Sequence, residues 1–229
     1  MLSSKKLKAL KPYIDILEKH KGSTLGDILI FLNNDGHHSH FKKGASGLII
    51  ENLLGLKNNN SKKADLEELN IEIKVLPVQL NNFKAKEPTQ IKMINYIKVA
   101  QEKWENTELR DKIETIFWVA YGVKKIDGKN CSQDKYILLD WFIDVPDEKT
   151  QGIFRKDWED IRSYIIHGKA DLLSCSMGVY IEPKTKGKNN KDLTNAPDGK
   201  GGLIKVRRRA FYFKKKYTNQ NIISQLDIK

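Results

Sequence analysis

The chain has 229 residues, of which 39% are hydrophobic and 31% charged, and its formal net charge is +12. This length fits one large domain or two small ones, and 8 Tyr, 8 Phe and 4 Trp suffice for a packed core. No apolar run approaches the roughly 20 residues needed to cross a bilayer, which argues against a membrane protein. The positive charge favours a polyanionic partner, with nucleic acid as the first candidate. The alternative is a composition that is rich in lysine throughout.

The chain contains only two cysteines, Cys131 and Cys175, which lie far apart in the sequence. They have no metal-ligand spacing and do not indicate a disulfide framework. We therefore expect a protein of the reducing cytoplasm.

The first third of the chain predicts helices. Apolar residues at spacings of 3 and 4 predict an amphipathic helix over residues 7–17. Thr24 is a candidate N-cap for a second helix through Leu32. A third helix is predicted over about residues 45–54, and Gly55 fits its C-terminal end.

Apolar and charged residues alternate over residues 71–75. This period of two predicts a half-buried strand with Glu72 and Lys74 side by side on one face. Asp65 lies upstream and can turn back toward this pair if residues 67–70 form the turn of a hairpin. Two carboxylates beside a lysine suit Mg²⁺-assisted phosphodiester hydrolysis, since carboxylates hold a hard ion and the lysine offsets phosphate charge or orients a water. The alternative is a solvent-facing strand with a surface salt bridge of roughly 0–1 kcal/mol.

The rest of the chain predicts a sheet with helices outside it. Segments rich in β-branched and aromatic residues predict strands at residues 91–99, 113–123, 136–145, 177–181 and 204–213. A helix is expected over residues 154–165, a long polar loop over 183–202, and a short terminal helix after the last strand. The predicted fold class is α/β, with helices flanking a mixed sheet.

Positive charge is concentrated in two late segments. Several lysines, Lys184 among them, lie in the predicted loop, and basic residues flank the aromatic run at 211–213. Such clustering is typical of phosphate binding, although each single lysine could be an ordinary solvated residue. Alternation places Arg207 and Arg209 on one face of the last strand and Arg208 on the other, so we expect an edge or partly covered strand.

An ordered set of segments then points to one family. They lie at residues 24–27, 43–51, 64–77, 104–107, 112–118, 157–159, 180–184 and 209–215. In order and approximate spacing, from about residue 22 to 220, they resemble the MutH-like family, which includes mismatch-repair nucleases and type II restriction endonucleases that cut GATC.

The resemblance implies a restriction-endonuclease-like fold, in which a mixed sheet is flanked by helices and two lobes form a DNA cleft. We accordingly expect residues 1–229 to form a single MutH-like endonuclease domain. Its N-terminal helical and catalytic lobe would span about residues 1–125, and its C-terminal DNA-contacting lobe about 126–229. The resemblance also implies Mg²⁺-dependent cleavage.

Carried over position by position, the resemblance makes Asp65 and Glu72 the Mg²⁺ ligands and Lys74 the catalytic lysine. Glu51 matches a helix acid that faces the metal site, and Lys112 matches a residue near the active site.

The expected DNA-contacting residues lie mostly in the late basic segments. They are Lys43, Pro183, Lys184, Lys186, Lys188, Arg209 and Tyr212. One departure stands out, because the family's base-contacting arginine before the proline is Glu182 here. A glutamate could accept a hydrogen bond from cytosine or could face away, which leaves the target sequence open.

Two biological roles share this chemistry. A restriction enzyme cuts both strands of unmethylated foreign DNA, whereas a repair nuclease nicks the unmethylated strand when a mismatch-repair partner activates it. Residues 92–102 and 180–187 are closer to the restriction branch, and the compact length is closer to the repair branch. We predict a type II restriction endonuclease acting on double-stranded DNA, alone or as a homodimer. The alternatives are a repair nuclease, and a catalytically inactive DNA-binding protein on the same scaffold.

Overall fold

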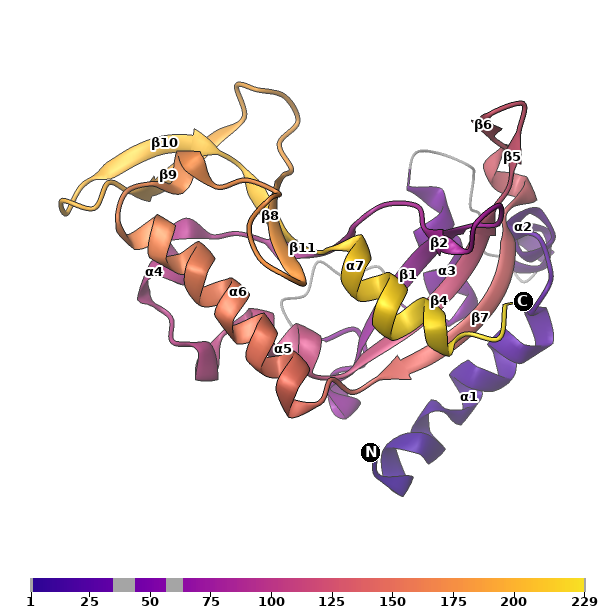
Figure 1. The fold of residues 1–229 in the computed structure, drawn as a ribbon. Helices are drawn as coiled ribbons and strands as arrows, with labels where there is room; N and C mark the ends of the chain where they lie inside the picture. Colours follow the sequence, from indigo (N-terminus) through magenta and orange to yellow (C-terminus); the bar gives the residue numbers. More distant parts are fainter. Residues whose placement is uncertain (1, 35–43, 57–63, 229) are drawn as a thin grey trace. The chain divides into compact units, whose positions relative to one another are not determined.

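The computed structural model describes residues 2–34, 44–56 and 64–228 and shows an α/β protein (Figure 1). The chain folds into two compact units, each assembled from separate stretches. Unit 1 comprises Met1–Glu87, Thr115–Val145 and Asn219–Lys229, and unit 2 comprises Pro88–Glu114 and Pro146–Thr218. The lobe boundary expected near residue 125 falls inside unit 1. The assignment of catalysis and DNA contact to the two halves of the chain stays a prediction.

Unit 1 is built on a four-stranded sheet with the strand order β2-β1-β4-β7. Its strands are β1 (Glu72–Gln79), β2 (Lys84–Ala85), β4 (Ile116–Val123) and β7 (Ile137–Asp144). β1 runs parallel to β4, whereas β2 and β7 run antiparallel to their neighbours. The helices of this unit are α1 (Ser4–His20), α2 (Leu25–Asn34) and α3 (Ala45–Leu53), and a small hairpin joins β5 (Lys125–Ile126) to β6 (Lys129–Asn130). The predicted mixed sheet flanked by helices is confirmed (Figure 1).

The core of unit 1 lies between this sheet and the three helices. Every residue of β4 is buried, as expected for a strand covered on both faces. Side chains of all three helices join its core, among them Leu10, Leu17, Ile28 and Ile49. The cap predicted at Thr24 is confirmed. The Asp27 amide donates to Thr24 Oγ1 (3.1 Å), and the Thr24 amide donates to the Asp27 carboxylate (3.2 Å), so α2 has a reciprocal cap.

Unit 2 combines a three-stranded antiparallel sheet, in the order β3-β11-β8, with a separate ribbon of β9 and β10. The strands are β3 (Thr89–Met93), β8 (Ile181–Thr185), β9 (Leu193–Pro197), β10 (Leu203–Arg207) and β11 (Arg209–Phe213). The helices are α4 (Tyr96–Gln101), α5 (Glu108–Glu114), α6 (Glu148–Ile166) and α7 (Lys215–Tyr217). An aromatic cluster packs α6 and α7 onto β11. The rings of Phe213 and Tyr217 stack at 5.0 Å, and Phe154 meets Tyr217 at 5.1 Å.

Several predicted boundaries in unit 2 are wrong. The strand expected over 91–99 ends at Met93, because the Asn95 side chain accepts from the Lys98 amide (3.1 Å) and caps α4. The strand expected over 177–181 is absent except for Ile181, which begins β8. The predicted loop over 183–202 contains the end of β8 and all of β9.

The last predicted strand, 204–213, is two strands with Arg208 between them. β11 is the central strand of its sheet and all five of its residues are buried, so the expectation of an edge or partly covered strand is wrong there. Arginines on both faces had suggested that the strand is exposed, but Arg209 is buried.

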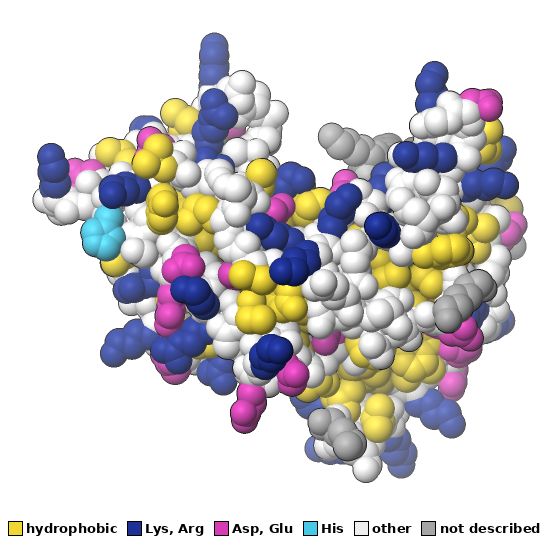
Figure 2. Space-filling model, viewed as in Figure 1, with side chains coloured by type: hydrophobic (Ala, Val, Ile, Leu, Met, Phe, Trp, Pro, Cys, Tyr) yellow, Lys and Arg dark blue, Asp and Glu magenta, His cyan; other side chains and the backbone are white. Residues whose placement is uncertain are grey.

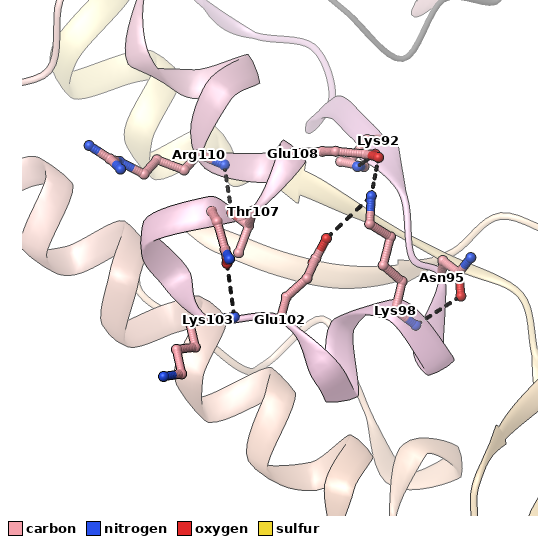
Figure 3. Close-up of polar contacts among 9 residues, drawn as sticks. Lys92, Asn95, Lys98, Glu102, Lys103, Thr107, Glu108 and Arg110 are labelled. Carbon is pink, nitrogen blue, oxygen red and sulfur yellow. Dashed lines mark hydrogen bonds and ion pairs between the residues drawn. The ribbon is translucent and has the colours of Figure 1, made fainter.

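A polar network joins β3, α4 and α5 within unit 2 (Figure 3). The Glu108 carboxylate pairs with the ammonium groups of Lys92 and Lys98, and Lys98 also lies 3.4 Å from Glu102. These two lysines hold the pKa of Glu108 down at about 2. The network therefore fixes the start of α5 to the strand and helix that precede it.

This network predicts an acid-sensitive component of stability. The folded pKa of Glu108 is below its ordinary value of 4.5, so its contribution is full above pH 4.5 and is lost as pH falls toward about 2. We expect Glu108→Gln to lower the free energy of unfolding at neutral pH by about 1 kcal/mol or less, since the pairs are partly exposed. Urea unfolding between pH 7 and 2 would show a shallower acid limb for the variant. Glu159→Gln, on an exposed pair with Arg155, should leave that limb unchanged.

Candidate active site and DNA-contacting surface

A tight hairpin precedes β1 and returns the chain onto it. The Leu66 amide donates to the Ile71 carbonyl (3.0 Å) across a one-turn helix at Glu67–Leu69. Asn70 closes this turn with φ +49°, in the left-handed region that asparagine tolerates better than most residues. The predicted turn over residues 67–70 is confirmed, and it brings Asp65 back beside the strand.

Asp65 is fixed against β1 by its own carboxylate. The Ile73 amide donates to Asp65 Oδ2 at 2.9 Å. Ile73 lies between Glu72 and Lys74 in the strand, so the hairpin places the aspartate next to both.

Glu72 and Lys74 form an ion pair on one face of β1. Their Oε1 and Nζ atoms lie 2.7 Å apart, and the side chains are only 3% and 15% exposed. The expected side-by-side placement is therefore confirmed. The alternative of a solvent-facing salt bridge is wrong, because a carboxylate this buried depends on its partner for stability.

Glu51 approaches the same group of charges from α3. Burial raises the pKa of its carboxyl, and repulsion from Asp65 raises it further. The attraction of Lys74 works the other way, and Glu72 adds a smaller repulsion. All four residues belong to unit 1. Three acids thus face one ammonium, and the site carries an excess of negative charge.

This donor set fits a hard divalent cation. Carboxylate oxygens are the ligands Mg²⁺ prefers, and Mg²⁺ commonly takes one or two of them and completes its shell with water and phosphate oxygens. Asp65 and Glu72, adjacent on the hairpin and strand, meet that requirement. No cage of three or more His, Cys, Asp or Glu side chains occurs in the part of the chain that the structure describes, so the protein alone does not enclose an ion there.

The geometry of unit 1 does not test two other expected site residues. Lys112 lies half-buried on α5, in unit 2. Lys43 lies outside the described residues. The roles given to both stay predictions.

The expected DNA-contacting residues of β8 and β11 do come together. Pro183 lies opposite Phe211 in the ladder, and the Lys184 ammonium lies 5.6 Å from the centre of the Tyr212 ring, within cation–π range. Glu182 lies opposite Tyr212 and is 7% exposed. Burial raises the pKa of the Glu182 carboxyl, against the attraction of Lys214 and Lys184.

Arg209 is placed differently from what its expected role suggested. Its side chain is buried in β11, and its Nη2 atom donates to the Asp171 carbonyl at 3.1 Å. A guanidinium in this position supports the strand from inside, and direct DNA contact by Arg209 stays a prediction.

The exposed residues Lys186 and Lys188 lie on an ordered turn between β8 and β9. The Asp192 carboxylate accepts from the Lys188 amide (2.9 Å) and from Arg208 Nε (2.7 Å), which ties the turn to the start of β11. Lysine and arginine side chains gather around this turn in Figure 2. Asp192 was not predicted from the sequence, although an aspartate near Asn189 and Asn190 is a signal for a side-chain-capped turn.

Comparison with known families agrees with this fold. The family described as "DNA mismatch repair enzyme MutH" matches residues 54–157, a segment that contains Asp65, Glu72 and Lys74. The chain is a member of the MutH-like nuclease family, whose relatives indicate an endonuclease that acts on DNA.

Individual relatives fall into two groups. The DNA mismatch repair protein MutH of Haemophilus influenzae strain PittGG is 26% identical over 82% of both chains. The MutH protein of Actinobacillus pleuropneumoniae serotype 3 is 27% identical over 89% of this chain and 90% of its own. The type II restriction enzyme Sau3AI of Staphylococcus aureus is 33% identical over 80% of this chain but only 37% of its own length. Within the described residues, no helix is both long and apolar enough to span a membrane.

Because Glu51 lies near two other acids, Asp65 and Glu72, we predict that its charge lowers the stability of the folded protein when no cation is bound. We expect Glu51→Gln to raise the melting temperature in EDTA at neutral pH by about 1–2 °C, because it removes a partly buried charge and its repulsion from Asp65. The folded pKa of Glu51 lies above its ordinary value of 4.5, so the gain should vanish as pH falls below 4.5. A lower melting temperature in EDTA would contradict this account.

The same variant should respond less to Mg²⁺. The stabilisation that a cation gives depends on its affinity for the folded protein, and Glu51→Gln weakens the field that attracts it. Differential scanning fluorimetry over a MgCl₂ series measures both effects. Glu68→Gln, an exposed acid of the same hairpin, is the matched control and should behave as wild type.

Proposed function

We propose that this protein is a Mg²⁺-dependent, sequence-specific endonuclease that hydrolyses DNA at GATC-type sites, acting as a type II restriction endonuclease. The observation that carries the proposal is the buried Glu72–Lys74 pair with Asp65 fixed beside it. Two carboxylates beside an ammonium suit phosphodiester hydrolysis, because the acids attract a cation and the ammonium offsets charge on the phosphate. Here both acids and the lysine are held by a strand and a tight hairpin.

Asp65 and Glu72 would hold the cation, with Glu51 adding to the negative field around it. When bound there, a divalent cation would offset charge on the phosphate and favour ionisation of a water molecule. Lys74 already donates to Glu72 at 2.7 Å, so its ammonium is oriented along the same face. From that place it can donate to an attacking water or to a phosphate oxygen, where added charge builds up in the transition state. Lys112 is proposed to support this site.

DNA binding is proposed to fall to the basic elements. Lys186 and Lys188 on the β8–β9 turn would contact phosphates, as would Lys43. Pro183 and Lys184 would lie at the bases, Lys184 reaching them with a side chain that the Tyr212 ring supports. The Pro183 side chain is buried on the other face of β8, so its part would be to shape the strand there. Arg209 would act within this surface from its buried position in β11.

Two features favour different biological roles. The higher identity to Sau3AI, 33% against 26% to a MutH protein, favours restriction. Coverage of 82% of both chains favours repair, in which the nuclease nicks one strand on activation by a mismatch-repair partner. We place restriction first, with activity in the cytoplasm either alone or as a homodimer, and keep repair as the second candidate.

If Glu72 and Lys74 are catalytic, replacing either residue should lower the rate of DNA cleavage but not the affinity for DNA. We expect Glu72→Gln and Lys74→Ala each to lower the cleavage rate by roughly 10²–10³-fold, since each removes a charge acting at the reacting phosphate. Affinity for a GATC duplex in Ca²⁺ should change little. Lys84→Ala, an exposed lysine of the same sheet, should cleave like wild type. Near-normal cleavage by either site variant would contradict the assignment.

The biological role is tested with plasmid DNA. Supercoiled plasmid with GATC sites is incubated with the protein and MgCl₂, beside a fully adenine-methylated copy. We expect fast linear fragments from the unmethylated plasmid only. Slow nicking that a mismatch-repair partner accelerates would establish the repair role instead. Binding without cleavage in Mg²⁺ or Mn²⁺ would mean an inactive DNA-binding protein, and fragments at other sites would mean a different target sequence.

A further inference from the structure

Asp157 is a buried acid in the middle of α6 and is 2% exposed. Its carboxylate accepts three hydrogen bonds from consecutive backbone amides. Oδ1 accepts from Val179 at 2.7 Å, and Oδ2 accepts from Tyr180 at 2.7 Å and from Ile181 at 2.8 Å. Bonds from three amides to one charged group make a strong and directional anchor.

The chain reaches this anchor through a turn that only glycine fits. Gly178 has φ +73°, and a Cβ there would lie 1.9 Å from the Ile181 carbonyl oxygen and 3.1 Å from Asp157 Cγ. The backbone therefore wraps closely around the carboxylate immediately before β8 begins at Ile181.

The pairing register of β8 against β11 depends on contacts outside the strand itself. Among the strands that the structure describes, β8 is an outer strand with β11 as its one partner, in the order β3-β11-β8, and Pro183 at its centre has no amide to donate. A slip of one residue would move Lys184 to the face opposite Tyr212, because side chains alternate along a strand. The amides that donate to Asp157 belong to the residues that lead into the strand, where these bonds oppose such a slip.

We propose that Asp157 is a positioning residue that sets the register of β8 and thereby the DNA sequence discrimination of the enzyme. It touches neither DNA nor the reacting phosphate, and it acts through the placement of Pro183 and Lys184. This inference rests on the proposed function, in which those two residues lie at the bases.

The test is Asp157→Asn, which keeps the size of the side chain but replaces one acceptor oxygen with a donor that faces backbone amides. The ratio of kcat/KM on a GATC duplex to kcat/KM on duplexes with one altered base pair is measured for each variant. We expect this ratio to fall about tenfold. The saturated rate on GATC and the salt dependence of non-specific binding should stay near wild type. Amide exchange at residues 179–181 should accelerate.

A matched control separates positioning from general destabilisation. Ile161→Val on the same helix is fully buried, lowers the melting temperature and leaves the anchor intact, so its discrimination should be unchanged. Val179→Pro deletes a single donor at an exposed position and gives a second variant should Asp157→Asn fail to fold. Its discrimination should fall in the same direction.

A double variant asks whether Asp157 acts through β8. If it does, Asp157→Asn combined with Lys184→Ala should lose little more discrimination than Lys184→Ala alone. Additive losses, unchanged discrimination in Asp157→Asn or Val179→Pro, or an equal loss in Ile161→Val would overturn the inference. A wild-type enzyme that cleaves without regard to sequence would instead refute the proposed function, and the two failures are thus distinct.

Discussion

The pairing of Glu72 with Lys74 is the interaction on which the candidate site depends. A carboxylate buried to this degree is costly unless a counter-charge and hydrogen bonds accompany it. β1 supplies the counter-charge two residues away on the same face, and the Asp65 hairpin adds a second acid through a bond to the strand backbone. β1 pairs with β4 along its whole length, so the backbone that carries both charged side chains is fixed in the core of unit 1. The sheet thus supplies the rigidity of the candidate site.

Unit 2 contains a second buried acid, which is stabilised in a different way. Asp157 is held by backbone amides rather than by a lysine, so its charge is stabilised by dipoles that belong to the segment it positions. Glu108 shows a third arrangement, in which two lysines from neighbouring elements converge on one carboxylate at a partly exposed position. Acidic residues therefore organise much of a strongly basic protein. Exposed lysines such as Lys186 and Lys188 are then available for a polyanion.

Sequence reasoning succeeded where a local pattern determines structure. The period of two at residues 71–75, the cap at Thr24 and the turn at residues 67–70 each depend on neighbouring residues, and each is confirmed. It failed where partners distant in sequence decide. Arg209 is buried because the Asp171 carbonyl and its central strand surround it, which no alternation pattern reveals. β9 was missed because its residues, Leu193–Pro197, become a strand only by pairing with β10.

The interleaving of the two units has a consequence for how the chain folds. The chain passes from one unit to the other after residues 87, 114, 145 and 218. Unit 1 is closed by contacts such as the Ala85 amide donating to Asn219 Oδ1 at 2.8 Å, across 134 positions of sequence. Ordering unit 1 therefore requires closing two loops that together contain all of unit 2, which slows folding relative to a protein with mainly local contacts. A single backbone cut between residues 88 and 114 would place β1 on one fragment and β4 on the other. The pairing of β1 with β4 would still hold the two fragments together, so the cut would not release the two units as separate domains.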